Sequence, residues 1–169
     1  IADSDRPKSS PDRPSMISRL VLVDDHPVVI NGYRMMLQAH PEYEICGTAT
    51  TEGEALDVVE REAPDLLITD LNMQGRGGME LIKDVIARHP RLKVLVSSMH
   101  DEMLYAARAL HAGAKGYVGK DSAGNALLDA IRRILDGGVY VSEKLAAHLA
   151  DSFAAARPRG SKASPLEKL

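Results

Sequence analysis

Polar side chains that could do chemistry stand where the apolar runs of this sequence end. They are Asp24 and Asp25 after RLVLV, Asp70 after LLIT, Ser97 and Ser98 in LKVLVSS, and Lys120 after AKGYVG. Burying a carboxylate without a partner costs several kcal/mol. An apolar run that delivers a carboxylate therefore indicates a group that is paired, or one that is held in place for a reaction.

The chemistry that these residue types favour is metal-assisted attack on phosphorus. In an open α/β sheet, ligands bind beyond the carboxyl ends of the strands, which would bring these side chains to one edge. Three carboxylates at one edge repel one another, and Mg²⁺ removes that repulsion because it prefers oxygen ligands. Beside such an ion, Asp70 can act as a nucleophile toward phosphorus. No GxGxxG or P-loop string is present, so a nucleotide site has no motif support.

Each of these residues also has a simpler interpretation. Either Asp24 or Asp25 could cap the helix that follows Pro27, and Asp70 could begin a turn before the glycines. Ser97 and Ser98 could cap a helix that starts near Asp101. Lys120, taken alone, is most often a solvated surface charge. The coincidence of complementary groups at four strand ends favours the functional interpretation.

The elements that must position these groups follow from the apolar pattern. Five apolar runs alternate with five segments of helical spacing, and the runs are nearly continuous rather than alternating. Continuous apolar strands are typical of a parallel sheet that is covered on both faces. The pattern predicts a doubly wound α/β fold with five parallel strands, five flanking helices and one extra C-terminal helix. Within the fifth of the flanking helices, an apolar stripe is formed by Leu127, Leu128, Ile131, Ile134 and Leu135.

Composition restricts the function further. The formal net charge of −3 over 169 residues gives no sign of a broad nucleic-acid-binding surface. No apolar run reaches the roughly 18 residues of a membrane-spanning helix, and no secretory signal is visible. Cys46 is the only cysteine, which fits a reducing compartment and predicts a cytoplasmic protein.

Composition also changes along the chain. Residues 1–15 are polar and rich in proline and serine, which predicts a disordered leader. The α/β pattern occupies 16–141, and a further helix is expected over 142–156. Residues 157–169 are basic and rich in Pro, Gly and Ser, so we expect a flexible linker there.

Four segments in this order make the sequence resemble a known family. They are LVDDHPVV, LLITDLNM, VLVSSMHDE and GAKGYVGKDS. Together they resemble the receiver domain of bacterial two-component response regulators, and within that superfamily the NarL/FixJ type. The resemblance covers about residues 18–153. It implies a flavodoxin-like sheet with strand order 2-1-3-4-5.

The resemblance also implies a role for each matching residue. Asp70 would accept the phosphoryl group, and Lys120 would pair with a phosphoryl oxygen. Mg²⁺ would be bound by Asp70, by Asp25 directly, by Asp24 mainly through water, and by the backbone carbonyl of Asn72. Ser98 would be the switch hydroxyl, and Tyr117 would be the switch aromatic, which turns inward when that hydroxyl moves. Two departures from the family are Met73-Gln74 in place of Met-Pro, followed by Gly77-Gly78, and Ser97 in place of a larger apolar residue.

The function implied is that of a phosphorylation-activated response regulator. A sensor histidine kinase would supply the phosphoryl group. The expected last helix has one lysine and no arginine, so it could not serve as a DNA-recognition helix. DNA would therefore be bound by a helix-turn-helix domain outside this chain. We expect no enzyme activity beyond uptake and slow loss of the chain's own phosphoryl group. Phosphorylation would favour a weak dimer. The alternatives are a stand-alone receiver that acts through protein contacts, and a Mg²⁺-dependent phosphatase of the haloacid dehalogenase type, whose DxDx[TV] motif is missing here.

Overall fold

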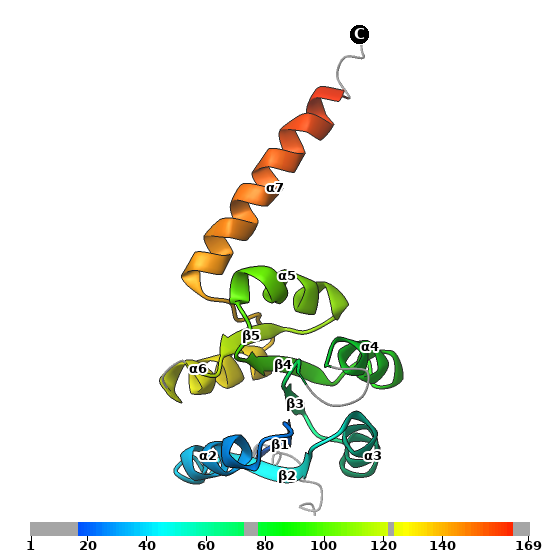
Figure 1. Cartoon of the computed structure of the whole chain (residues 1–169), viewed down its shortest axis with the longest axis vertical. Helices are drawn as coiled ribbons and strands as arrows, with labels where there is room; N and C mark the ends of the chain where they lie inside the picture. Colours follow the sequence, from blue (N-terminus) through cyan, green and yellow to red (C-terminus); the bar gives the residue numbers. More distant parts are fainter. Residues whose placement is uncertain (1–16, 73–77, 122–123, 164–169) are drawn as a thin grey trace, which may run out of the picture.

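The structure, a computed structural model of the chain, describes residues 17–72, 78–121 and 124–163, with side chains as far as residue 155. Strands and helices alternate along these residues (Figure 1). The strands are β1 (Ser18–Val23), β2 (Tyr43–Ala49), β3 (Leu66–Thr69), β4 (Lys93–Ser98) and β5 (Gly116–Gly119). The helices are α2 (Pro27–Gln38), α3 (Glu52–Glu62), α4 (Gly78–Arg88), α5 (Glu102–Ala112), α6 (Gly124–Leu135) and α7 (Glu143–Ala163).

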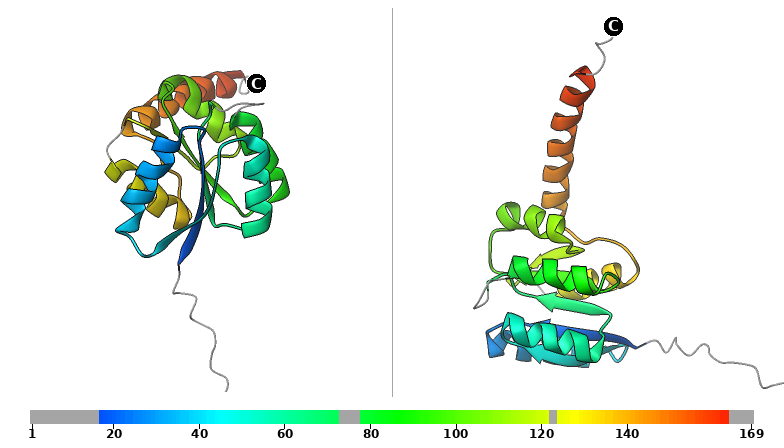
Figure 2. Two further views of the ribbon diagram at one scale, coloured as in Figure 1. Left: turned by 60° about the horizontal axis from the view of Figure 1, so that its bottom comes forward. Right: turned by 90° about the vertical axis from the view of Figure 1, so that its right-hand side faces the viewer.

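The strands form one parallel sheet in the order β2-β1-β3-β4-β5. Helices α2 and α6 lie on one face of the sheet, and α3, α4 and α5 lie on the other (Figure 2). The fold class, the five parallel strands and the strand order are therefore confirmed. All the strands run in the same direction, so their carboxyl ends meet at one edge of the sheet.

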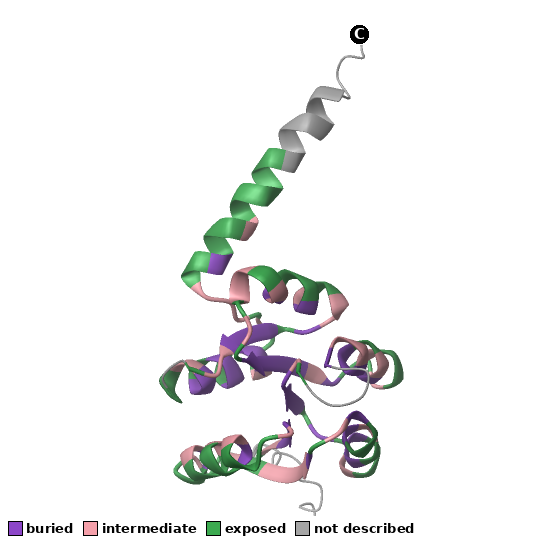
Figure 3. Ribbon diagram, in the orientation of Figure 1, coloured by how far each residue is buried: buried purple, intermediate pink, exposed green. Residues whose placement is uncertain are grey.

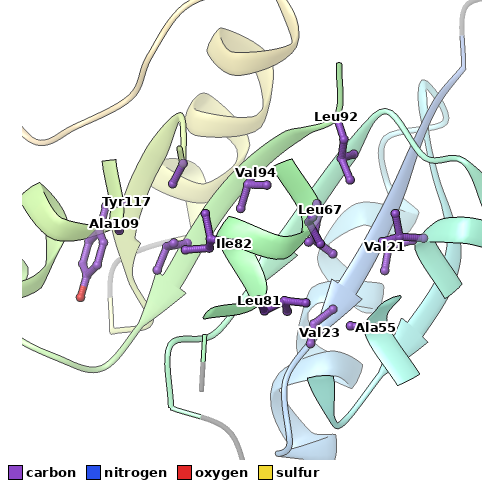
Figure 4. Close-up of a cluster of buried hydrophobic side chains, with 14 of the residues drawn as sticks. Val21, Val23, Ala55, Leu67, Leu81, Ile82, Leu92, Val94, Ala109 and Tyr117 are labelled. Atoms are coloured by element: carbon purple, nitrogen blue, oxygen red, sulfur yellow. The ribbon is translucent and has the colours of Figure 1, made fainter. Parts of the chain in front are cut away.

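The sheet separates two apolar clusters because successive strand residues point to opposite faces. Val21, Val23 and Leu67 face α3 and α4, whereas Leu20 and Leu22 face α2 and α6. Figure 3 shows the strands as the most deeply buried part of the molecule, and Figure 4 shows the cluster under α3–α5. This two-sided burial explains why the strands read as continuous apolar runs.

Helix α6 uses its apolar stripe to cover the sheet. Leu127, Leu128, Ile131 and Ile134 are buried, and Leu135 is half-buried against the same cluster. Exposed apolar side chains on this side of the molecule come instead from α2, where Val28 is 76% and Met35 is 72% exposed.

Helix α7 is longer than the expected 142–156, since it continues to Ala163. The pattern suggested an end near Pro158 because a proline inside a helix removes one hydrogen bond. The alanine-rich run before it favours the helix, and extending an existing helix costs far less than starting one. Helix α7 projects away from the sheet beyond α5 (Figure 1). None of the helices in the described ranges has an apolar stretch long enough to cross a membrane.

Candidate functional site

The carboxyl edge of the sheet brings together the groups that the sequence placed at strand ends. Asp24 follows β1 and Asp70 follows β3, and they are only 4% and 2% exposed. Lys120 follows β5, and Ser98 is the last residue of β4. The backbone maintains this convergence, because Asp70 N–H donates to Val23 O at 3.1 Å and Lys120 N–H donates to Ser98 O at 2.9 Å.

Lys120 joins the two buried carboxylates. Its Nζ lies 2.6 Å from Asp24 Oδ2 and 3.1 Å from Asp70 Oδ2, and its side chain is 7% exposed. Burial by itself would lower the pKa of Lys120, but the hydrogen bonds to Asp24 and Asp70 outweigh it and raise the pKa above the ordinary value. The lysine is therefore a buried, protonated cation between the two carboxylates rather than a solvated surface charge.

Asp24 is engaged through both oxygens. Its Oδ2 contacts Lys120, and its Oδ1 accepts the backbone N–H of His26 at 2.9 Å and lies 2.9 Å from His26 Nδ1. The N-cap residue of α2 is His26, whose side chain makes no capping hydrogen bond. Neither Asp24 nor Asp25 occupies the N-cap position, so the capping interpretation of these acids is wrong.

Asp25 offers an oxygen without a hydrogen bond. Its Oδ1 is buried and accepts none, although His26 Nδ1 lies 3.0 Å away. One ligand atom each from Asp24, Asp25, His26 and Asp70 lies within 4.8 Å of the others. Three carboxylates, one with an unsatisfied buried oxygen, are the donor set that a hard divalent cation such as Mg²⁺ needs. The residues present therefore fit a bound Mg²⁺ ion.

The two serines of β4 face opposite sides of the sheet. Ser97 lies on the α2 side, where its hydroxyl is hydrogen-bonded to the hydroxyl of Tyr33. Ser98 Oγ accepts the backbone N–H of His100 at 3.0 Å in the loop before α5. Neither serine caps α5, because the N-cap is Asp101, whose side chain accepts from Met103 N–H at 2.8 Å.

Tyr117 lies on the same face of the sheet as Ser98. It is 1% exposed, and its hydroxyl donates to His100 O at 3.0 Å. Burial raises the pKa of Tyr117, so the phenol is protonated at neutral pH and can donate this bond. His100 is thus held through its N–H by Ser98 and through its carbonyl by Tyr117. Ser97 contacts Tyr33 on the other face of the sheet instead.

Gly78, at the start of α4, packs directly against the backbone of the predicted phosphoacceptor. A Cβ at this position would lie 2.4 Å from Asp70 O and 2.5 Å from Leu71 Cα. Gly78 N–H also donates to Leu71 O at 3.0 Å. Close packing against Asp70 and Leu71 therefore requires a glycine at position 78. Asn72 is exposed two residues after Asp70, and the departures at residues 73–77 lie outside the described residues.

Sequence reasoning did not find Tyr33, His26 or Gly78 as neighbours of the site. His26 and Gly78 stood in quoted motifs, DDHP and the glycine pair, but their partners are set by geometry. Tyr33 read only as part of an amphipathic helix. Burial raises the pKa of Tyr33, whereas its hydrogen bond to Ser97 and the charge of Lys120 act in the opposite direction.

In doubly wound α/β proteins, ligands bind beyond the carboxyl ends of the strands, and here buried aspartates and a lysine lie at that edge. Residues 20–132 match the family model described as the response regulator receiver domain. The chain belongs to this family, and its relatives place it with the NarL/FixJ type. That membership removes the support for a haloacid dehalogenase-type phosphatase.

Three similar proteins illustrate the relationship. The transcriptional regulatory protein DegU of Brevibacillus brevis is 33% identical over 135 residues, which cover 80% of this chain and 57% of DegU. The oxygen regulatory protein NreC of Staphylococcus haemolyticus is 36% identical over 136 residues, covering 80% of this chain and 63% of NreC. A LuxR-family two-component response regulator from Aurantimonas sp. SI85-9A1 superposes with a TM-score of 0.75 at 34% identity, over 81% of this chain and 98% of that one. The chain thus spans about three fifths of the length of the curated relatives.

Proposed function

We propose that this chain is the phosphoacceptor part of a cytoplasmic response regulator, and that Asp70 takes a phosphoryl group from a sensor histidine kinase. The observation that carries the proposal is the buried cluster of Asp24, Asp70 and Lys120 at the carboxyl edge of the sheet. Two buried carboxylates and one buried ammonium are costly to maintain, and the fold would gain more from apolar residues at these positions. A buried lysine whose pKa is raised by its hydrogen bonds to two carboxylates is typical of a functional site.

The proposed reaction needs a nucleophile and compensation of charge. An oxygen of Asp70 forms a bond to phosphorus, while the bond between phosphorus and the kinase imidazole nitrogen breaks and the imidazole keeps the electron pair. Lys120, freed from part of its contact with Asp70, pairs with a phosphoryl oxygen. Ser98 donates its hydroxyl to another. Beyond this uptake and the slow loss of the same group, we propose no enzyme activity.

The metal would be held by Asp25 and Asp70 directly, by the backbone carbonyl of Asn72, and by Asp24 mainly through water. A bound Mg²⁺ ion supplies charge neutralisation at the phosphoryl oxygens. Supporting this assignment, both oxygens of Asp24 are already engaged, whereas Asp25 Oδ1 has no hydrogen bond.

The output that we propose is control of transcription. Residues 16–141 would form the receiver, and α7 (Glu143–Ala163) would be the linker helix. The helix would lead toward a DNA-binding domain outside this chain, since DegU, a transcriptional regulatory protein, is covered over only 57% of its length. The second candidate is a stand-alone receiver that acts through protein contacts. The length of the full gene product, measured by intact mass from its natural source, distinguishes the two.

The test of the proposal is incubation with a small phosphodonor and Mg²⁺, followed by intact mass spectrometry. We expect a gain of one phosphoryl group that depends on Mg²⁺. No gain with several phosphodonors, in protein whose fold is verified by circular dichroism, would contradict the proposed function.

Substitutions at Asp24 and Asp25 should separate their roles in metal binding. We expect Asp25→Ala to lose more Mg²⁺ affinity than Asp24→Ala, because one carboxylate binds directly and the other through water. Titration calorimetry on the two variants and the unsubstituted chain measures the difference. A larger loss in Asp24→Ala would reverse the assignment.

Phosphorylation should shift a weak monomer–dimer equilibrium toward the dimer. The stripe on α6 mostly covers the sheet, so Val28 and Met35 on neighbouring α2 are the exposed apolar side chains that this face offers. A phosphoryl group changes the equilibrium only by its differential interaction with the two states, about 1–3 kcal/mol. Sedimentation velocity with and without beryllofluoride over a concentration series provides the measurement. Equal weight-average masses, with analogue binding verified, would remove dimerisation as the output.

A further inference from the structure

The segment that leads into α7 is fixed to β5 beside the switch tyrosine. Tyr117 N–H donates to Tyr140 O at 3.1 Å, and Tyr140 N–H donates to Lys115 O at 2.9 Å. These two bonds form an isolated parallel bridge between Gly116 and Tyr140. The backbone just before α7 therefore moves with β5.

The first turn of α7 is held from a different element, the first turn of α5. Ser142 is placed as the cap of α7, because its Oγ accepts Leu145 N–H at 3.0 Å. The same hydroxyl donates to Glu102 Oε1 at 2.9 Å, and Ser142 N–H makes a longer bond of 3.4 Å to Glu102 Oε2. Leu145 is fully buried in the cluster under α3–α5. In Figure 1 the lower end of α7 lies beside α5.

Glu102 stands directly after the loop that the switch residues hold. His100 is bonded to Ser98 Oγ through its N–H and to the Tyr117 hydroxyl through its carbonyl, each at 3.0 Å. A Ser98 hydroxyl that turns toward a phosphoryl group on Asp70 gives up the N–H of His100, so the loop that ends at Glu102 loses one of its two anchors. Ser142 keeps its own anchor, because Tyr140, two residues before it, is bridged to β5. The two halves of the Glu102–Ser142 contact are therefore anchored by different hydrogen bonds, and only those on the Glu102 side include Ser98.

We propose that the Glu102–Ser142 contact is a latch that opens when Asp70 is phosphorylated and frees the first turn of α7. Glu102 and Ser142 are then positioning residues that connect the phosphoryl site to the helix leading out of the domain. This inference rests on the proposed function, since it requires a phosphoryl group at Asp70. The contact would then have a closed and an open state, and phosphorylation of Asp70 would favour the open one.

Thermodynamic linkage separates a latch from a static contact. If phosphoryl binding opens the latch, then breaking the latch must strengthen phosphoryl binding by the same factor. A purely structural contact predicts no such gain, because its loss lowers stability without favouring either state of the site. Affinity for a phosphoryl analogue is therefore the informative quantity.

The experiment is a titration of the full chain with beryllofluoride in the presence of Mg²⁺. We expect Ser142→Ala to bind the analogue about fivefold more tightly or better, at the lower end of typical allosteric couplings. Ser142→Thr keeps the hydroxyl and should restore the original affinity. Ser152→Ala makes the same change at an exposed position of α7 and is the matched control.

A second variant protects the test against misfolding of the first. Glu102→Ala removes the other half of the contact and should raise the affinity to a similar degree, and the double variant should add little, because both changes break one interaction. Hydrogen exchange should show faster exchange in the first turns of α7 when beryllofluoride binds to the unsubstituted chain.

The outcomes distinguish the latch from the function on which it rests. If the unsubstituted chain binds beryllofluoride but the latch variants show unchanged affinity, the latch is wrong and the phosphoryl site stands. Unchanged exchange in α7 on analogue binding contradicts the latch in the same way. If the unsubstituted chain does not bind the analogue at all, the proposed function fails and the latch fails with it.

Discussion

Replacing Asp70 by Asn should abolish phosphorylation completely while leaving the fold intact. The amide has nearly the same shape as the carboxylate, but it lacks the nucleophilic oxygen that forms the acyl phosphate. The position of Asp70 is set mainly by its backbone, which donates to Val23 O at 3.1 Å. Removing one of the carboxylates near Lys120 also lowers the repulsion in the cluster, so we expect no large loss of stability.

Intact mass spectrometry after incubation with a small phosphodonor and Mg²⁺ measures this effect. Asp57→Asn, at an exposed position of α3, makes the same chemical change away from the site and should be labelled like the unsubstituted chain. Labelling of Asp70→Asn at normal stoichiometry would show that another residue is the acceptor.

Replacing Lys120 by Met should produce the largest loss of stability among these substitutions. Asp24 and Asp70 are almost fully buried, and the lysine is the cation that contacts both. Removing one partner of a buried ion pair leaves an uncompensated charge and costs about 3–5 kcal/mol. The raised pKa of Lys120 means that this charge is present throughout the neutral range.

Urea denaturation in the presence of a chelator gives the free energy of unfolding for comparison. Mg²⁺ should then stabilise Lys120→Met more than it stabilises the unsubstituted chain, because the ion replaces the missing positive charge. Lys83→Met, at an exposed position of α4, is the matched control and should change stability little. A loss below about 1 kcal/mol for Lys120→Met would mean that the carboxylates are compensated in another way.

Much of the fold could be predicted because its signals are local. Continuous apolar runs identified the strands, helical spacing identified the segments between them, and their alternation required parallel strands joined by helices. That arrangement alone brings Asp24, Asp70, Ser98 and Lys120 to one edge, whichever residues they contact there. The end of α7 was the main local error, since the helix continues past Pro158.

Contacts between residues far apart in the sequence were decided only by the tertiary structure. The sequence by itself could not show that Lys120 contacts Asp24 as well as Asp70, or that Gly78 packs against Asp70 O. The sequence by itself determined which chemical groups meet at the edge. The groups that end each strand, and the two-residue period of its side chains, can be found in short segments. The hydrogen-bond partners at the site, and the contact between Ser142 and Glu102, depend on how the helices pack on the sheet. Packing brings together segments that are distant in the sequence, so no local pattern predicts these contacts.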